Sequence, residues 1–204
     1  MKKYITELVG TFFLVLTIGN CVLGKAPTPP IAIGLALAVM IFAGGHISGG
    51  HFNPAVTLAV WLRGKCDTKD IVPYILAQII GAGAAAGVVK FLQGHGGDAT
   101  GVANVAPALV AELLGTFALA WVVLNVATTK ATNGNSFYGA AIGLTVTAMA
   151  FSLGPISGGA FNPAVAIGAT MMGLFKASDL WIYLVACPAG GAAAALLFKG
   201  LKVE

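Results

Sequence analysis

Two nearly identical segments of ten residues, far apart in the chain, constrain this sequence more than any other feature. Residues 47–56 read ISGGHFNPAV and residues 156–165 read ISGGAFNPAV, so the copies differ at a single position. Their asparagines, Asn53 and Asn162, are separated by 109 residues. Agreement of this length does not arise by chance, and it predicts an internal duplication.

A second match extends the duplication beyond this motif. The segment ELVGTF, which begins at Glu7, recurs as ELLGTF, which begins at Glu112. The two copies therefore cover approximately residues 1–95 and 107–204, and we expect them to build one domain over residues 1–204.

The composition places both copies in a membrane. Hydrophobic residues make up 58% of the chain and charged residues 9%, with a mean hydropathy of +0.91, whereas soluble domains carry about 25% charged residues. A membrane-spanning helix needs about 20 apolar residues. Long apolar runs predict spans near residues 4–23, 31–46, 70–91, 107–129, 137–154 and 179–198.

Two further apolar stretches, residues 53–62 and 162–174, are too short to cross a bilayer of about 30 Å at about 1.5 Å per residue. We interpret them as half-helices of re-entrant segments, which enter and leave the membrane on one side. Each copy then has three spans and one re-entrant segment. Because three is odd, the second copy must be inverted relative to the first, and the half-helices approach each other from opposite faces.

The basic residues predict the orientation of the chain. The run at 4–23 follows Lys2 and Lys3 and so resembles a signal peptide, but its length and Glu7 favour an uncleaved first span. With cytoplasmic N- and C-termini, most basic residues lie inside, as the positive-inside rule requires. The inside group is Lys2, Lys3, Arg63, Lys65, Lys69, Lys130, Lys199 and Lys202, and the outside group is Lys25, Lys90 and Lys176.

The spacing of these basic residues also indicates which partners the protein binds. They form no basic stripe, so we expect no nucleic-acid partner despite the net charge of +4. The expected partners are the lipid bilayer and small neutral molecules. The compact chain without targeting elements suggests a prokaryotic plasma or inner membrane.

The Asn-Pro-Ala triplets predict how each half-helix begins. Asparagine is a preferred N-cap and proline a preferred first helical residue. Helix N-termini carry roughly half a positive charge, so two opposed N-termini at mid-membrane repel cations and protons. The capping residues Asn53 and Asn162 can donate amide hydrogen bonds to the oxygen of a passing water or hydroxylated solute.

The Ser-Gly-Gly stretches before each asparagine predict extended backbone that lines an aqueous path, since such backbone is not tolerated in contact with lipid. Its carbonyls form a ladder of acceptors, and the opposite wall is expected to be apolar, which keeps binding weak and transit fast. The sequence thus indicates a passive pore for small uncharged molecules. The expected pore carbonyls belong to Gly49, Gly50, His51, Gly158, Gly159 and Ala160.

With these motifs, the chain resembles the aquaporin, or major intrinsic protein, family over essentially its whole length. The resemblance implies an all-α membrane protein of six transmembrane helices plus two re-entrant half-helices, assembled as a homotetramer with one pore per subunit. It assigns the pore motifs to Asn53, Pro54, Ala55, Asn162, Pro163 and Ala164, and the outer selectivity filter to Ile33, Ala150, Gly159 and Val165.

The filter positions depart from the family pattern. Most members follow the second triplet with an arginine, where this chain has Val165. Water-selective members have a histidine at the position of Ala150, and glycerol facilitators have aromatic residues near the constriction and an aspartate shortly after the second triplet. Ile33, Gly159 and Ala166 match neither pattern. We therefore expect a wide, apolar constriction that passes water and also solutes such as glycerol, urea or ammonia, while ions and protons are excluded.

Two alternatives from other functional classes stay open at this point. Inverted repeats and broken helices also occur in secondary transporters, and Glu7 and Glu112 are the residues that a proton-coupled mechanism could use. Their equivalent positions favour a structural role instead, as acceptors for the N–H groups of the re-entrant segments. An intramembrane enzyme would need a catalytic constellation within the spans, and we find none in the sequence.

The histidines, the cysteines and one run of small residues could suggest metal or cofactor sites, but structural roles explain them better. His46 and His51 lack a third ligand nearby in the sequence, and the cysteines are widely spaced, so we expect neither a metal site nor a disulfide framework. The run of small residues at 81–87 superficially resembles a dinucleotide loop, but its position within an apolar span favours close helix packing. We expect no cofactor. The cysteines are Cys21, Cys66 and Cys187.

Overall fold

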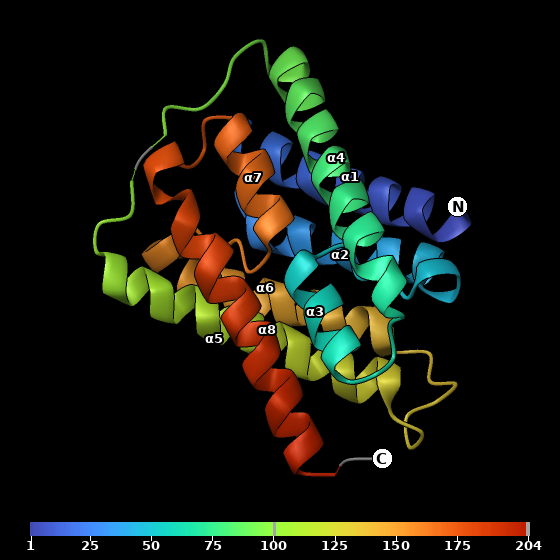
Figure 1. Cartoon of the computed structure of the whole chain (residues 1–204). Helices are drawn as coiled ribbons and strands as arrows, with labels where there is room; N and C mark the ends of the chain where they lie inside the picture. The colour runs from blue at the N-terminus through green and yellow to red at the C-terminus, as the bar shows by residue number, and fades with distance from the viewer. Residues whose placement is uncertain (100, 203–204) are drawn as a thin grey trace.

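The computed structural model describes residues 1–99 and 101–202, which form a bundle of helices (Figure 1). Six of the described helical segments are long and apolar enough to cross a membrane, and two nine-residue helices lie between them. In chain order the elements are α1 (Lys2–Leu23), α2 (Pro29–Ser48), α3 (Pro54–Leu62), α4 (Thr68–Gln93), α5 (Val105–Thr128), α6 (Tyr138–Ser157), α7 (Pro163–Met171), the short 3-10 helix η1 (Ala177–Asp179) and α8 (Leu180–Gly200).

The predicted architecture of six spans and two half-helices is confirmed, and one predicted boundary is wrong. The second half-helix was expected to reach residue 174 but ends at Met171. Gly173 adopts a left-handed φ of 76°, and the Leu174 N–H donates to the Ala169 carbonyl at 2.8 Å. This is a glycine-dependent helix ending, which stops the helix although the following residues are apolar. Gly64 ends α3 in the same way, with a φ of 78°.

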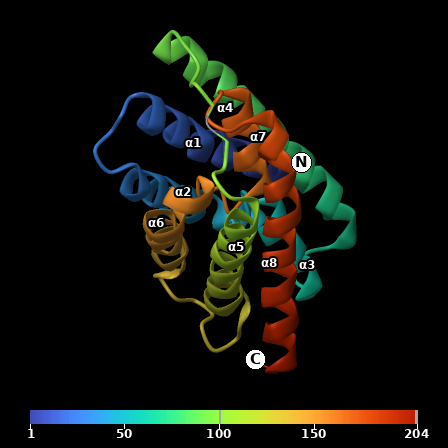
Figure 2. The same ribbon diagram turned by 90° about the vertical axis from the view of Figure 1, so that its left-hand side faces the viewer.

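The helices pair within and between the two halves of the chain. The most extensive contacts join α1 to α4 and α5 to α8, which are equivalent pairs in the two copies. Helix α2 packs against α6 from the other half, and Figure 2 shows these two helices side by side. Each half-helix also packs on the last long helix of the opposite half, α3 on α8 and α7 on α4. The two halves are therefore interleaved.

Chain connectivity defines two ends of the bundle. We call the end that holds the start of α1, the end of α8 and the connections 63–67 and 129–137 the termini side. The opposite end, with the connections 24–28, 94–104 and 172–176, is the far side. The long connection on the far side is anchored to the second half, because the Gly97 N–H donates to Met172 O and the Val102 N–H donates to Asp179 Oδ2.

Two equivalent glycines allow close helix approaches within each half. A Cβ atom on Gly81 would lie 2.4 Å from the carbonyl oxygen of Leu8, and a Cβ on Gly190 would lie 2.3 Å from that of Leu113. Both contacts are to backbone, which cannot rotate away. The backbones of α1 and α4, and of α5 and α8, thus approach as in other membrane helix pairs built on small residues.

This packing predicts a contrast between glycines of the same helix. Gly81→Ala should lower the free energy of unfolding by about 1–3 kcal/mol, because the added methyl group forces α1 and α4 apart. Gly87→Ala is the matched control, since a Cβ there meets no atom within 4 Å, and it should gain up to about 1 kcal/mol from helix propensity. Thermal unfolding in detergent, followed by circular dichroism, measures both. Equal stability of the two variants would contradict the packing argument.

Candidate functional site

The two half-helices begin in the same way at the centre of the bundle. Asn53 Oδ1 accepts from the N–H of Ala55 at 2.8 Å, and Asn162 Oδ1 accepts from the N–H of Ala164 at 2.9 Å. Each asparagine has extended backbone and is followed by a proline at the first helical position. The side-chain oxygens satisfy free N–H groups at the helix starts, as expected for N-caps.

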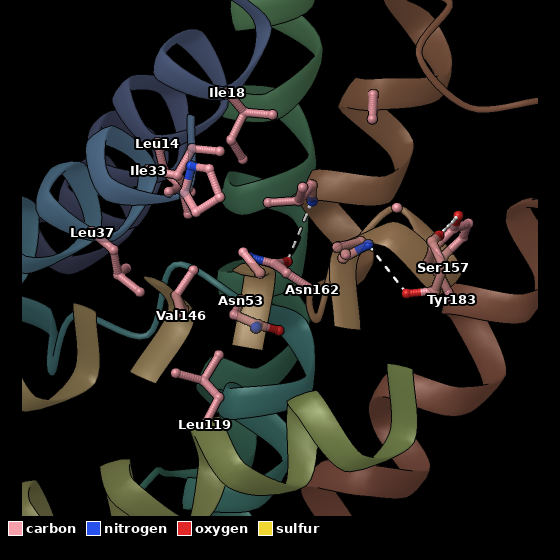
Figure 3. Close-up of a pocket in the computed structure, with 18 of the residues that line it drawn as sticks. Leu14, Ile18, Ile33, Leu37, Asn53, Leu119, Val146, Ser157, Asn162 and Tyr183 are labelled. Carbon is pink, nitrogen blue, oxygen red and sulfur yellow. Dashed lines mark hydrogen bonds between the residues drawn. The ribbon is translucent and has the colours of Figure 1, made fainter. Parts of the chain in front are cut away.

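The same two side chains join the halves of the chain. Asn53 Nδ2 donates to the carbonyl of Phe161 at 2.8 Å, and Asn162 Nδ2 donates to the carbonyl of Phe52 at 2.9 Å. A primary amide has two N–H groups, and within residues 1–99 and 101–202 only one of them is hydrogen-bonded on each asparagine. Figure 3 shows both amides close together in the middle of the cavity described below.

A buried carboxylate holds the first re-entrant segment. Glu7 in α1 is fully buried and accepts four hydrogen bonds: from the N–H of His51 at 2.9 Å, the N–H of Phe52 at 2.7 Å, Ser48 Oγ at 2.7 Å and Gln78 Nε2 at 2.8 Å. Charge-assisted bonds of this kind are the strong ones in proteins. The carboxylate therefore supplies acceptors that an extended backbone in the bundle interior would otherwise lack.

Glu112 in α5 does the same for the second segment. It accepts from the N–H of Ala160 at 3.0 Å, the N–H of Phe161 at 2.7 Å, Ser157 Oγ at 2.6 Å and the Cys187 thiol at 3.4 Å. The fourth donor is thus a thiol where the first half has an amide. With the N–H groups turned toward the carboxylates, the carbonyls of these segments are the groups left for the cavity.

Both segments contain a phenylalanine in an unusual backbone conformation. Phe52 and Phe161 have φ values of 48° and 49°, in the left-handed region that costs a non-glycine residue about 1–3 kcal/mol. Their rings are buried against Gly10 and Gly115, where an added Cβ would lie 2.2 Å from a ring atom in each case. Ring burial and the carboxylate bonds together hold this conformation.

A cavity of about 530 Å³ runs past the two asparagines. All four expected filter residues line it, as do five of the six expected carbonyl residues. Its other wall is apolar, and Figure 3 shows several of these side chains on one side of the asparagines. The apolar lining residues include Leu14, Ile18, Leu37, Leu119, Val123, Ile142 and Val146.

Comparison with known proteins identifies a family with this arrangement. The sequence profile of the major intrinsic protein family matches residues 1–198. The chain belongs to the major intrinsic protein family. It is 39% identical to glycerol uptake facilitator protein-like 6 of Lactiplantibacillus plantarum over 100% of both chains, and 35% identical to aquaporin NIP1-1 of Zea mays over 99% of this chain and 75% of that protein.

Two further relatives extend the comparison. Aquaporin AqpM of Methanothermobacter thermautotrophicus is 35% identical over 100% of this chain and 98% of its own length. Among solved structures, the aquaglyceroporin from Plasmodium falciparum matches with a TM-score of 0.83 over 98% of this chain and 96% of that chain, at 22% identity. At this identity the structural match supports the family's fold.

The ring of His51 adds an acceptor to the cavity of this family member. Thr57 Oγ1 donates to the Asn53 carbonyl at 3.0 Å, and His51 Nδ1 lies 3.1 Å from Thr57 Oγ1. With this direction of the Thr57 bond, Nδ1 is the donor to Oγ1, and a neutral ring then has its acceptor at Nε2. Among residues 1–99 and 101–202, Nε2 has no hydrogen-bond partner, and the residue lines the cavity.

The remaining predicted residues lie outside the main cavity. Gly49 borders two smaller cavities on the termini side, while Glu7 and Glu112 lie behind the re-entrant segments. The prolines and alanines of the Asn-Pro-Ala motifs are buried inside α3 and α7 and hold the asparagines in place. They are Pro54, Ala55, Pro163 and Ala164.

Sequence reasoning missed the donors that complete the two carboxylate sites. Ser48 and Ser157 were visible as part of the repeated motif, where their equivalence was a usable signal. Gln78 and Cys187 are also separated by 109 residues, but they differ in residue type. Only the fold brings them to equivalent places beside Glu7 and Glu112.

The hydrogen bonds of Glu112 predict that replacing its carboxylate with an amide strongly destabilises the protein. Glu112→Gln should lower the free energy of unfolding by about 3 kcal/mol, because an amide replaces one acceptor oxygen with a donor and leaves a buried N–H unpaired. Thermal unfolding in detergent tests this. Asp98→Asn removes the same charge from an exposed residue of the far-side connection and should change stability little. A Glu112→Gln protein as stable as the control would be incompatible with the proposed role.

Proposed function

We propose that this protein is a passive channel for water and small uncharged solutes, and that the main cavity is its pore. One observation carries the proposal: a single cavity has two amide donors and a line of backbone carbonyls on one side and an apolar wall on the other. A solute that crosses it replaces part of its hydration on the polar side and binds weakly on the other. Relatives named aquaporin and glycerol uptake facilitator support the same function.

Exclusion of ions and protons is part of this proposal. The N-termini of α3 and α7 meet at Asn53 and Asn162, so their partial positive charges add at one point of the pore. The free N–H on each asparagine orients the oxygen of a passing water. A water that accepts two such bonds cannot relay a proton through that point.

We assign the selectivity filter to Ile33, Ala150, Gly159 and Val165, which all line the pore. None carries a polar side chain. The relatives named above include both aquaporins and a glycerol uptake facilitator, and an apolar filter with two small residues suits the broader solute range. Glycerol, urea or ammonia are therefore expected to pass beside water.

The proposed setting is a plasma or inner membrane, with the termini side in the cytoplasm and four copies assembled as a homotetramer with one pore each. Eight of the eleven basic residues belong to the termini side, in agreement with the positive-inside rule. Many apolar side chains are exposed on the bundle surface, where lipid or a neighbouring copy would cover them. A prokaryotic origin is proposed from the compact chain.

The filter assignment predicts the flux of the unmodified protein and of one variant. In stopped-flow light scattering on reconstituted vesicles, the wild type should pass water and at least one of glycerol, urea and ammonia. Val165→Arg should suppress glycerol and urea more than water, about tenfold or more, because the long charged side chain narrows the opening. Exclusion of all three solutes by the wild type would refute the wide filter.

Two controls make this experiment specific. Val165→Leu enlarges the side chain without adding charge, so it separates narrowing from electrostatics. A proton gradient across the vesicles should leave solute flux unchanged, whereas a transporter that couples through Glu7 or Glu112 would respond to it. Gradient-driven accumulation of solute would favour the transporter and overturn the passive channel.

The electrostatic barrier predicts the effect of a charge at the centre of the pore. Asn162→Asp places a carboxylate between the two helix N-termini and should raise cation conductance several-fold in planar bilayers, because it offsets their positive potential. The aspartate can still cap α7 through its oxygens. Asn104→Asp, exposed at the start of α5 and outside the pore lining, is the control. Unchanged conductance in a folded Asn162→Asp protein would contradict this origin of the barrier.

A further inference from the structure

A second cavity, of about 560 Å³, lies on the termini side beside the pore. It is lined by the end of α2, the connection after α3, the end of α5, the loop between α5 and α6 and the start of α6. It shares Ile142 with the pore lining, and it shares Gly49 and Lys65 with a smaller cavity that also contacts His51. We call it the vestibule. A molecule held there would lie beside the termini-side part of the pore.

The lining of the vestibule carries positive charge and no negative charge. Lys65 and Lys130 contribute it from two different elements, and no aspartate or glutamate is among its lining residues. Its volume falls within the range of about 300–1,000 Å³ that is typical of small-molecule sites. The chemistry of the lining therefore suits a small anion.

The carboxylates near Lys65 are paired with other groups. Asp70 and Asp67 border the adjacent smaller cavity, which Lys65 also lines. Asp70 is bonded to Lys3 and accepts from Tyr4 Oη at 2.7 Å, while Asp67 pairs with Lys69 at 3.6 Å. Among residues 1–99 and 101–202, neither Lys65 nor Lys130 has a carboxylate partner.

Neutral groups complete the lining. The side chains of Asn133 and Tyr138 border the vestibule and can donate hydrogen bonds. Cys66 lies in the adjacent cavity, and burial, with Asp70 and Asp67 nearby, raises the pKa of its thiol, so it adds no negative charge at neutral pH.

Hydrogen bonds within the loop between α5 and α6 fix its shape. Asn135 Nδ2 donates to the Val126 carbonyl at 2.8 Å, and Thr129 Oγ1 donates to the Asn125 carbonyl at 2.7 Å. Both acceptors belong to the last turns of α5. The loop that presents Lys130 is thus tied to the helix before any ligand arrives, which lowers the entropic cost of binding.

Membrane topology explains why lysines occur on this side, but it does not explain why they line a cavity. The two copies differ at the equivalent position: Lys65 follows the first half-helix, and Leu174 follows the second and lines the far-side part of the pore. The same fold position is therefore cationic at one mouth and apolar at the other. This asymmetry points to a ligand on the cationic side.

We propose that the vestibule binds a small phosphate monoester and that the bound anion obstructs the pore. Ammonium groups form charge-assisted hydrogen bonds with phosphate oxygens, and a dianion matches two lysines. This goes beyond the proposed channel function, because it adds a ligand site and a control of flux. The phosphate monoester can be a soluble metabolite or the headgroup of a phosphatidic-acid lipid, which share this chemistry.

Binding to the solubilised protein is measured first, with inorganic phosphate and glycerol 2-phosphate as probes, by isothermal titration calorimetry at low ionic strength. Both probes should bind the wild type, and higher salt should weaken binding because the lysines are exposed. Lys65→Gln/Lys130→Gln should weaken it about tenfold, since each exposed ion pair accounts for up to about fivefold.

A matched control removes the same charge elsewhere on this side. Lys2→Gln/Lys199→Gln alters two lysines that line none of the cavities described here, and it should bind the probes like the wild type. Equal weakening in both double variants would reduce the effect to general charge attraction and overturn the site. Absence of binding to soluble probes, together with no phosphatidic-acid-dependent binding to vesicles, would also overturn it.

Flux measurements test the second half of the proposal and keep it separate from the channel function. Glycerol 2-phosphate on both sides of reconstituted vesicles should slow water flux through the wild type and leave the Lys65→Gln/Lys130→Gln protein unaffected. Binding without any slowing would refute obstruction. A protein that binds the probes but passes neither water nor solute would instead refute the proposed channel.

Discussion

The hydrogen bonds between a buried carboxylate and a re-entrant backbone segment are the interaction on which the rest of this structure depends. Extended backbone at membrane depth has no water to satisfy its polar groups. Glu7 and Glu112 each accept two backbone N–H bonds from such a segment, at distances between 2.7 and 3.0 Å. Because the N–H groups of each segment bond to the carboxylate behind it, its carbonyls are left to face the main cavity. The placement of the asparagines, the left-handed phenylalanines and the start of each half-helix all follow from this arrangement.

The hydrogen-bonding frame is nearly symmetric, but the side chains at the two ends of the pore differ. The capping bonds, the cross-bonds of Asn53 and Asn162 and the glycine endings of α3 and α7 agree closely in the two copies. One difference lies within the frame, where Gln78 in the first half corresponds to Cys187 in the second. The others lie in side chains outside it: His51 against Ala160 beside the pore, and Lys65 against Leu174 at its mouths. Duplication thus supplies the scaffold, and the direction-dependent chemistry comes from substitutions that leave the hydrogen-bonding backbone intact.

The sequence predicted those parts of the fold that depend on local chemistry or on the repeat. Apolar runs located the spans, and asparagine with proline located the starts of both half-helices. The end of the second half-helix was misjudged because Leu174 continues the apolar pattern, whereas Gly173 ends the helix through its backbone conformation. The vestibule was not predictable. Lys65 and Lys130 are far apart in the chain, and nothing local indicates that they share one cavity.

In the proposed channel, exclusion of ions would not require a charged filter. An ion that enters must give up hydration, at a cost of several kcal/mol even after relaxation of the protein. Ile33, Ala150 and Val165 offer no polar side-chain atom to replace the lost water, and the acceptors lie on one side of the cavity. A cation therefore finds incomplete coordination and then the positive ends of α3 and α7. An anion finds few donors beyond the two asparagine amides. A neutral solute avoids most of this cost, so the apolar filter can favour uncharged molecules while setting a loose limit on their size.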